Sequence, residues 1–402
     1  MPDTAALYDR YILHTAKRSL TLASGEGVRV RDSEGNDYLD FATGIAVSCL
    51  GHNHPALAEV YATQARKLIH CSNLYYNEIA GPVGERLVHL FGPGKIFFSN
   101  SGAEANEGLI KLARLFGRER GAYEVITARN SFHGRTMATL SATGQEKIQS
   151  GFAPLVPSFP HVPYNDLAAA RAAITDKTAA ILVEGIQGES GIVPATAEYL
   201  LGLRALTKEK NLLLLIDGVQ CGHFRTGAFQ SWQRLLEGHP GAAAFRPDAV
   251  SSAKSLGGGF PIGAFWIDEP YASLFTPGSH NTTYGGSPLG TAVIGAILEV
   301  IEKEKLAANI RQRGDQLLAG LRSLQKTYPA IAEVRGYGAL VGLELTTEPA
   351  ETQPHFTAAG LLLAPAGNKT LRYLPAYIAT AADIDEALAR TEQALKNLAK
   401  AS

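Results

Sequence analysis

The chain of 402 residues is 46% hydrophobic and 19% charged, which is typical of a globular protein long enough for two domains and excludes a disordered chain. Its 37 basic and 38 acidic residues give a formal net charge of −1 without a basic block, so we expect neither nucleic acid nor a membrane as a partner. Three scattered cysteines, with no signal peptide and no long apolar run, predict a cytoplasmic protein without a disulfide framework.

The first predicted element is a hairpin over residues 28–41, because strand-like runs flank the turn residues Gly35 and Asn36. Through the middle of the chain, apolar strand-like runs alternate with amphipathic helical patterns. Strands are expected at 95–99, 124–127, 179–183, 212–216 and 264–267, and helices at 103–118, 167–174 and 197–210. This alternation predicts an α/β fold, with a mostly parallel sheet that helices cover on both faces.

The pattern changes near residue 289. Long helices are expected at 289–304 and 306–328, then short strands near 339–345 and 370–374, and a closing helix from Ala382. We interpret this part as a second, smaller α+β domain that the hairpin joins. The predicted division is an N-terminal segment 1–50 that joins the small domain, a large domain 51–288, and a small C-terminal domain 289–402.

A lysine and an aspartate at the ends of two strand-like runs are the most informative residues. Lys254 stands shortly before Gly257–Gly259, and a lysine in such a place can form a Schiff base with an aldehyde. Asp217 follows the apolar run 212–216, where a carboxylate can keep a pyridine nitrogen protonated. Together they favour a site for pyridoxal 5′-phosphate, although each alone is more often a solvated loop charge or a cap.

Further stretches offer groups suited to the same cofactor. Residues 99–107 follow a strand and open a helix, where small residues let backbone N–H groups approach a phosphate. Phe132 can stack on a flat ring, and Gln220 can donate to a phenolate oxygen. Two carboxylates flank the glycine-rich strand end at 182–191, and residues 280–286 offer hydroxyls and glycines to a phosphate. In isolation, each stretch is more often a cap, a turn or part of the core.

These stretches, in this order, resemble the class III (ornithine-type) aminotransferases, which are pyridoxal-phosphate enzymes of fold type I. The resemblance extends from about Tyr8 to Leu398. It implies a large domain with a mostly parallel seven-stranded sheet and a smaller α+β domain. The N-terminal pieces 38–41, 44–47, 51–55 and 72–78 are most similar to the acetylornithine branch of the family.

The resemblance implies a role for each cofactor-binding position. Lys254 would carry the cofactor covalently and then act as the base of the 1,3-proton shift. Asp217 would pair with the pyridinium nitrogen, Gln220 would approach the 3′-oxygen, and Phe132 would lie on the ring face. The phosphate would be held at the start of a helix by Ser101, Gly102 and Ala103. Thr283 of a neighbouring subunit would contribute a hydroxyl, which makes a homodimer part of the active site.

Three more residues are implied to bind substrates. Arg372 matches the family arginine that grips the α-carboxylate of glutamate or 2-oxoglutarate, because a planar guanidinium binds a carboxylate through two hydrogen bonds. Glu189 matches the acid that pairs with this arginine when the entering substrate has no α-carboxylate at that place. Arg135 matches the position that meets the far carboxylate of an acyl-ornithine, although an arginine is more commonly part of a surface ion pair.

The implied reaction is a ping-pong transfer of the ω-amino group of N²-acetyl-ornithine to 2-oxoglutarate, which gives N-acetylglutamate 5-semialdehyde and glutamate. Succinylornithine, ornithine, 4-aminobutyrate and lysine-derived donors stay open. Ile45 favours an acylated donor, because ornithine δ-aminotransferases tend to have a tyrosine near this position. The alternative from a different functional class is a non-catalytic protein that binds pyridoxal phosphate without turnover.

The chain departs from the family pattern beside Asp217. Gly218 stands where the family usually has a glutamate, Phe224 stands where a second glycine is typical, and the stretch 227–247 is several residues longer than usual. These changes affect the wall of the site and therefore the substrate more than the cofactor chemistry. His52 and His54 have a spacing that suits a metal, but no third ligand is placed near them, so we expect no metal site.

Overall fold

The computed structural model describes residues 4–367 and 369–401. Within these residues, the largest sheet has seven strands in the order β4-β12-β11-β10-β7-β5-β6. β12 runs antiparallel to both of its neighbours, whereas the pairs from β11 to β6 are parallel. The predicted α/β class and mostly parallel seven-stranded sheet are therefore confirmed. The strands are β4 (Gly94–Ser99), β5 (Glu124–Ala128), β6 (His161–Val162), β7 (Thr178–Glu184), β10 (Leu213–Asp217), β11 (Ala249–Ser252) and β12 (Gly263–Asp268).

The central strands of this sheet are apolar throughout because both of their faces are covered. Every residue of β7 and β10 is buried. Successive side chains enter opposite cores, as the two-residue period of a strand requires: Ile181 packs in one apolar cluster and Leu182 in another. Helix α9 (Ala197–Glu209) contributes Leu200 to the first cluster, and α5 (Gly102–Gly117) contributes Leu109 to the second.

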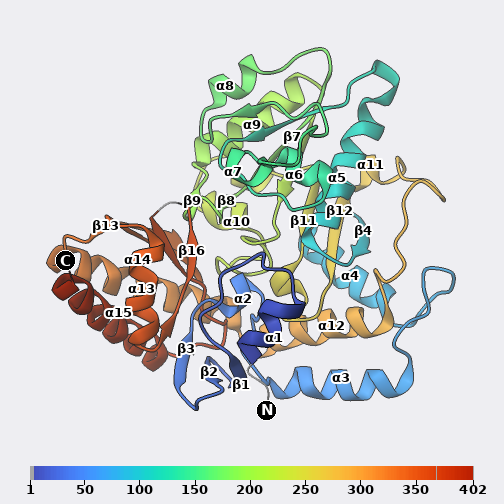
Figure 1. Ribbon diagram of the computed structural model, residues 1–402. Coiled ribbons are helices and arrows are strands. Elements are labelled where there is room, and N and C mark those ends of the chain that lie inside the picture. Colours follow the sequence, from blue (N-terminus) through green and yellow to red (C-terminus); the bar gives the residue numbers. More distant parts are fainter. Residues whose placement is uncertain (1–3, 368, 402) are drawn as a thin grey trace.

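The other helices of the large-sheet part surround these layers (Figure 1). They are α3 (Pro55–Lys67), α4 (Ala80–Phe91), α6 (Met137–Ala142), α7 (Glu146–Gln149), α8 (Leu167–Ala172), α10 (Ser231–Leu235), α11 (Glu269–Ala272) and α12 (Pro288–Lys303). A short ribbon of β8 (Ile186–Gln187) and β9 (Val193–Pro194) follows β7. No helix among those described is long and apolar enough to cross a membrane.

The C-terminal part is a separate layer of helices on a four-stranded antiparallel sheet, seen at the left of Figure 1. The order is β13-β14-β17-β16, and α13 (Leu306–Thr327), α14 (Pro349–Ala358) and α15 (Ala381–Ala401) pack with it. Its strands are β13 (Ile331–Tyr337), β14 (Leu340–Leu345), β16 (Ala364–Ala366) and β17 (Thr370–Tyr373).

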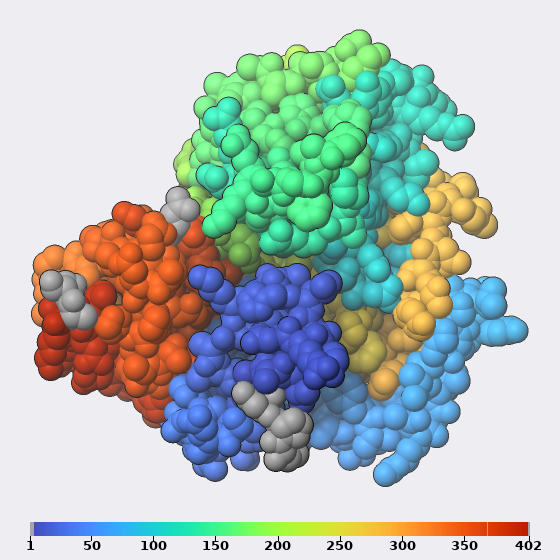
Figure 2. Space-filling model, in the orientation of Figure 1, coloured from blue at the N-terminus to red at the C-terminus, as the bar shows by residue number. Residues whose placement is uncertain are grey.

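The expected hairpin is formed by β2 (Arg29–Asp32) and β3 (Asp37–Asp40), with β1 (Leu22–Glu26) beside it. β15 (Leu361–Leu362), from the C-terminal part, pairs in parallel with β3, so the hairpin and β15 share one sheet. Figure 2 shows the blue N-terminal residues between the orange-to-red C-terminal part and the green part of the large sheet. The domain boundaries at residues 50 and 288 stay predictions.

Two elements near the N-terminus complete the fold: α1 (Thr4–Tyr11) and the short turn α2 (Thr43–Ala46). α2 is unusual because its residues have left-handed backbone angles, with φ of 45° at Thr43, 64° at Gly44, 64° at Ile45 and 63° at Ala46. The left-handed conformation costs about 1–2 kcal/mol per residue that is not glycine. The rest of the protein must therefore hold this turn in place.

Candidate active site

A cavity of about 430 Å³ opens at the edge of the large sheet where the parallel strands end at their carboxyl termini. Ligands of open α/β sheets bind at this edge. β10 delivers Asp217, and Lys254 follows β11. Most of the residues expected to bind cofactor or substrate line this cavity together: Ser101, Gly102, Ala103, Phe132, Arg135, Asp217, Gln220 and Lys254.

Lys254 presents a free amine to the cavity. It begins a 3₁₀ turn that Ala253 separates from the end of β11, and it has a left-handed φ of 50°. Its Nζ forms no hydrogen bond or ion pair with the residues that the structure describes. Removal from bulk water lowers the pKa of Lys254 from 10.5 to about 8, although the Glu189 carboxylate acts in the opposite direction. About one of these amines in ten is therefore neutral, and hence nucleophilic, at pH 7.

Both carboxylate oxygens of Asp217 accept hydrogen bonds from neighbouring groups. Its Oδ2 accepts hydrogen bonds from Asn106 Nδ2 at 2.7 Å and from His133 Nδ1 at 2.8 Å. Its Oδ1 accepts from the backbone N of Val219 at 3.0 Å. Only 3% of the Asp217 side chain is exposed, so the carboxylate has a fixed orientation toward the cavity that Asn106 and His133 also line.

The start of α5 forms the part of the cavity wall that suits an anion. Ser101 is the N-cap residue, and its hydroxyl accepts a hydrogen bond from the backbone N of Glu104 at 3.2 Å. Gly102 and Ala103 then line the cavity at the positive end of the helix dipole. A Cβ atom at Gly102 would lie 2.7 Å from Val219 Cγ1, so a larger residue does not fit there.

Arg372, Glu189 and Gln220 form one hydrogen-bonded cluster beside the cavity. Arg372, on β17, is 1% exposed, and its guanidinium donates to both carboxylate oxygens of Glu189, at 2.6 Å and 3.2 Å. Arg372 Nη1 also donates to Gln220 Oε1 at 3.0 Å. Burial alone would raise the pKa of Glu189, but the charge and hydrogen bonds of Arg372 outweigh it and lower that pKa. Gln220 thus connects this ion pair to the cavity that it lines.

Glu184 is a second buried carboxyl group in the cavity wall, at the end of β7. Its two oxygens accept hydrogen bonds from the backbone N of Phe132 and of Gly188, both at 3.2 Å. Burial, with Asp217 nearby, raises its pKa well above the usual value. The group therefore joins the segment that carries Phe132 to the segment that carries Glu189.

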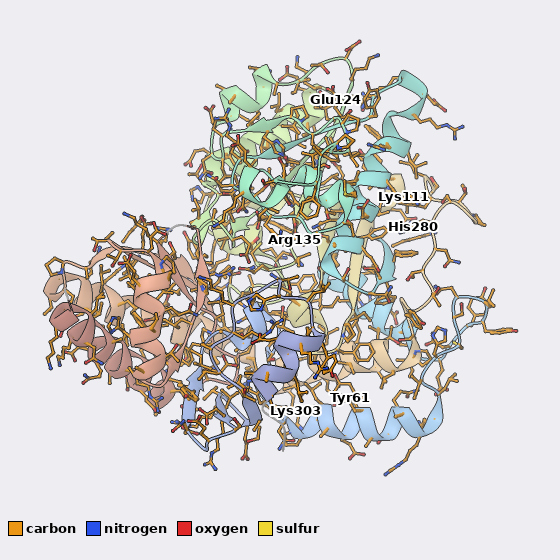
Figure 3. The ribbon with its side chains drawn as sticks, in the orientation of Figure 1. Tyr61, Lys111, Glu124, Arg135, His280 and Lys303 are labelled. Carbon is orange, nitrogen blue, oxygen red and sulfur yellow. The ribbon has the colours of Figure 1, made fainter. Side chains whose placement is uncertain are left out.

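Two expected residues lie away from the centre of the cavity. Arg135 lines the cavity but is exposed, and its Cζ lies 5.5 Å from the ring centroid of Phe132. It lies near the middle of the molecule in the view of Figure 3. Thr283 is exposed and lines a different cavity of about 440 Å³, together with Thr282 and Asn100. Asn100 borders both cavities, so they are neighbours. Within a single chain, Thr283 is not part of the Lys254 cavity.

The departures from the family pattern have a structural account. A Cβ atom at Gly218 would lie 2.7 Å from Gln230 Oε1 and 2.8 Å from the backbone oxygen of Ser251, so the buried Gln230 takes the space of a side chain there. Phe224 keeps a left-handed φ of 67° although it is not glycine, and its ring packs 5.4 Å from that of Phe229. The stretch 227–247 contains α10, whose buried Trp232 packs in the core.

The family profile described as "Aminotransferase class-III" matches residues 13–395. The chain belongs to this family. The acetylornithine aminotransferase of Gloeobacter violaceus is 47% identical over 392 residues, covering 96% of each chain. The acetylornithine/succinyldiaminopimelate aminotransferase of Yersinia pestis is 41% identical, covering 98% of this chain and 97% of its own. The solved ornithine aminotransferase of Toxoplasma gondii ME49 matches with a TM-score of 0.93 and 30% identity, covering 99% of this chain and 95% of its own.

As a class III aminotransferase, the protein is a transaminase that depends on pyridoxal phosphate. The cavity fits this cofactor. It combines a free amine, a fixed carboxylate and a helix N-terminus on its wall, which are the groups that the aldehyde, the ring nitrogen and the phosphate require. Two buried atoms of cavity residues, Asn106 Oδ1 and His133 Nε2, have no hydrogen-bond partner in the described structure.

Three of these residues are not among the site residues predicted from the sequence: Asn106, His133 and Glu184. For Asn106 a signal was present, because it lies four residues after Gly102 and therefore on the same face of the helix. His133 is adjacent to Phe132, but its contact with Asp217, 84 residues further along the chain, depends on the fold.

Proposed function

We propose that this enzyme transfers the ω-amino group of N²-acetyl-ornithine to 2-oxoglutarate, giving N-acetylglutamate 5-semialdehyde and glutamate. The single observation that carries this proposal is the ion pair of the buried Arg372 with the half-buried Glu189 beside the Lys254 cavity. The acetylornithine aminotransferase of Gloeobacter violaceus, at 47% identity over nearly the whole chain, supports the acetylated donor. Ile45, 42% exposed on α2, supports it too, since an apolar side chain there offers no partner to a free α-amino group.

The geometry of the cavity supports the proposed cofactor contacts. When bound, pyridoxal phosphate supplies an electron sink for the bonds at the amino-bearing carbon. Lys254 carries the cofactor and moves a proton with its Nζ, for which a pKa of about 8 is well placed. Asp217 holds the ring nitrogen, and the amide of Gln220 reaches the 3′-oxygen. Phe132 covers a face of the ring.

The proposed phosphate site is the N-terminus of α5. The Ser101 hydroxyl already accepts from Glu104 N, so it contributes as a donor through its hydrogen. The backbone N–H groups of Gly102 and Ala103, at the start of the helix, are the other proposed donors.

Arg372 and Glu189 explain how one site can take two different substrates. In the first half-reaction the donor presents its ω-amine, and Glu189 keeps Arg372 neutralised by two hydrogen bonds. In the second half-reaction the α-carboxylate of 2-oxoglutarate replaces Glu189 on the guanidinium. The proposed partner for the distal carboxylate of the acyl-ornithine is Arg135, which is exposed at the cavity edge and so is open to a ligand.

The proposed assembly is a homodimer with shared active sites, in which Thr283 of each chain completes the phosphate site of the other. Supporting this, large apolar side chains are exposed in the segment before α4 and beside Thr283: Leu74 (78%), Tyr75 (73%), Tyr76 (105%) and Tyr284 (66%). Asn73 Nδ2 donates to the backbone oxygen of Thr282 at 2.7 Å, so these segments form one surface. Exposed apolar groups gathered in this way mark an interface.

We also propose that the enzyme works in the cytoplasm. Its three cysteines are free, and two of them, Cys49 and Cys221, are buried thiols. A protein of a reducing compartment has this pattern.

Steady-state kinetics with 2-oxoglutarate as acceptor tests the substrate. We expect kcat/KM for acetylornithine to exceed that for ornithine and 4-aminobutyrate. A preference for free ornithine would refute the proposed donor but keep the reaction class. Succinyl-diaminopimelate is the second candidate donor, since the Yersinia pestis relative at 41% identity is named for both compounds. Equal kcat/KM values for the two acylated donors would identify a dual enzyme.

A further inference from the structure

Arg225 is a buried arginine outside the cavity, and the proposed reaction leaves it without a role. It lies five residues after Gln220 and is 0% exposed. No carboxylate of a described residue lies within ion-pair distance of its guanidinium. A buried cation without a carboxylate is unfavourable unless other groups satisfy its hydrogen atoms.

Backbone oxygens from separate segments accept hydrogen bonds from Nη1 and Nη2 of the guanidinium, whereas Nε has no hydrogen-bond partner among the described residues. Nη1 donates to Pro375 O at 2.7 Å and to Ala339 O at 3.4 Å, and Nη2 donates to Ala46 O at 3.2 Å. The guanidinium also lies over the ring of Tyr377, 4.5 Å from its centroid. The planar fork of an arginine therefore connects three stretches of backbone that are far apart in the sequence.

Two of these stretches, and the segment of Arg225 itself, lead to different parts of the active site. Ala46 ends the left-handed turn α2, and the next residue, Val47, lines the cavity. Pro375 and Tyr377 follow β17, which carries Arg372. Arg225 itself belongs to the segment that begins with Asp217 and Gln220. In Figure 1, α2 lies where the C-terminal part meets the large-sheet part.

The strained turn is fixed at both ends. At its start, Asp40 Oδ1 accepts hydrogen bonds from the backbone N of Ala42 at 3.0 Å and of Thr43 at 2.8 Å. Thr43 Oγ1 donates to Leu374 O at 2.7 Å. At its end, Ala46 O accepts from Arg225. Residues that are not glycine leave left-handed angles when such contacts are removed.

We propose that Arg225 is a positioning residue that holds the left-handed turn, and with it Ile45 and Val47, at a fixed place relative to Arg372. In this way it contributes to the selection of an acylated donor over free ornithine. The selectivity part of this proposal rests on the proposed function. The positioning part depends only on the contacts of Arg225 and on the backbone of α2.

Hydrogen exchange over residues 42–49 tests the positioning part directly, in purified protein. Arg225→Lys keeps the positive charge but loses the planar guanidinium with its two Nη donors. We expect hydrogen exchange in this stretch to become about tenfold faster or more, because hydrogen bonds to a charged group are lost. Arg204→Lys is the matched control. Arg204 is also buried, but it pairs with Asp248 away from the cavity, so residues 42–49 should keep their exchange rates.

Adding Ala46→Gly to Arg225→Lys separates positioning from general stability. Glycine adopts left-handed angles without strain, so the double variant should recover much of the lost protection of residues 42–49. Where the enzyme uses acetylornithine, Arg225→Lys should also lower the ratio of kcat/KM for acetylornithine to that for ornithine, mainly through KM. Ala46→Gly should restore this ratio.

Several results would overturn the inference. These are unchanged exchange in residues 42–49 of Arg225→Lys, equal acceleration over the whole chain, or no recovery with Ala46→Gly. If Arg225→Lys does not fold, Thr43→Val removes the hydrogen bond to Leu374 O, a second anchor of the turn, without touching the buried cation. It should accelerate exchange in the same residues, and an unchanged rate there would overturn the proposal. A wild type that ignores acetylornithine would refute the proposed donor, whereas the exchange result would still decide the role of Arg225.

Discussion

His133 Nδ1 lies 2.8 Å from Asp217 Oδ2, and solvent reaches neither group to any extent, with 0% and 3% of the two side chains exposed. Since a carboxylate accepts hydrogen bonds, Nδ1 carries the hydrogen. Asn106 Nδ2 donates to the same oxygen at 2.7 Å. The carboxylate that is proposed to hold the cofactor nitrogen is therefore oriented by two buried side chains from α5 and from the segment after β5.

His133→Phe should weaken cofactor binding because it removes one of these donors while filling the same space. A hydrogen bond to a charged group contributes about 1.5–3 kcal/mol, so we expect Kd for pyridoxal phosphate to rise about 10- to 100-fold. An absorption titration of cofactor-free protein measures this. His161→Phe is the control, because His161 is half-buried nearby but contacts Ala142 O instead. Equal losses in the two variants would contradict a specific role for His133.

Lys254→Ala should abolish turnover and the absorption band of covalently bound cofactor. Lys305→Ala is a matched control, because Lys305 also has a left-handed φ, of 53°, but lies at the start of α13. The alternative, a protein that binds pyridoxal phosphate without catalysis, predicts no turnover in the wild type and identical behaviour of the Lys254 variant.

The rate at which cofactor-free protein combines with pyridoxal phosphate should rise with pH and level off above about 8, the pKa of Lys254. The neutral amine is the reactive form, so a lowered pKa makes it available at lower pH. At pH 7 about one amine in ten is neutral, compared with about one in three thousand for an ordinary lysine. Stopped-flow absorption at a series of pH values gives the midpoint. A midpoint near 10.5, the ordinary lysine value, would contradict the desolvation of Lys254.

Arg372→Ala should raise KM for 2-oxoglutarate and leave Glu189 without its partner. Truncating one member of a buried charge pair costs about 2–5 kcal/mol. Steady-state kinetics with varied 2-oxoglutarate measures the change. Arg204→Ala is the control, because Arg204 is also a buried arginine in an ion pair, with Asp248 at 2.7 Å. An unchanged KM in the Arg372 variant would mean that the carboxylate binds elsewhere.

Much of the fold follows from local patterns. The buried run before Asp217 and the alternation of strands and helices predict the parallel sheet, because strands buried on both faces must be continuously apolar. β13 is not predicted from the sequence. Two consecutive residues, Ala332 and Glu333, are exposed, so the strand lacks the regular alternation of apolar and polar side chains. The left-handed turn α2 is not predicted either, because Thr43, Ile45 and Ala46 have no intrinsic preference for those angles.

The candidate site was predictable where a residue acts from a strand end or a helix start. Lys254, Asp217 and Ser101 belong to this group, and the cavity brings them together. Residues that act through another side chain were not predictable. The contacts of Asn106 and His133 with Asp217 join positions 111 and 84 residues apart, and such pairs depend on the packing of whole elements.

The most direct test of the central claim is an absorption spectrum of the purified holoenzyme before and after acetylornithine is added without any keto acid. We expect the band of lysine-bound cofactor to disappear while that of the aminated cofactor grows, and 2-oxoglutarate to reverse the change. A band that ignores acetylornithine but responds to glutamate would contradict the proposed donor. The absence of any lysine-bound band, even after cofactor is supplied, would contradict the assignment of Lys254 itself.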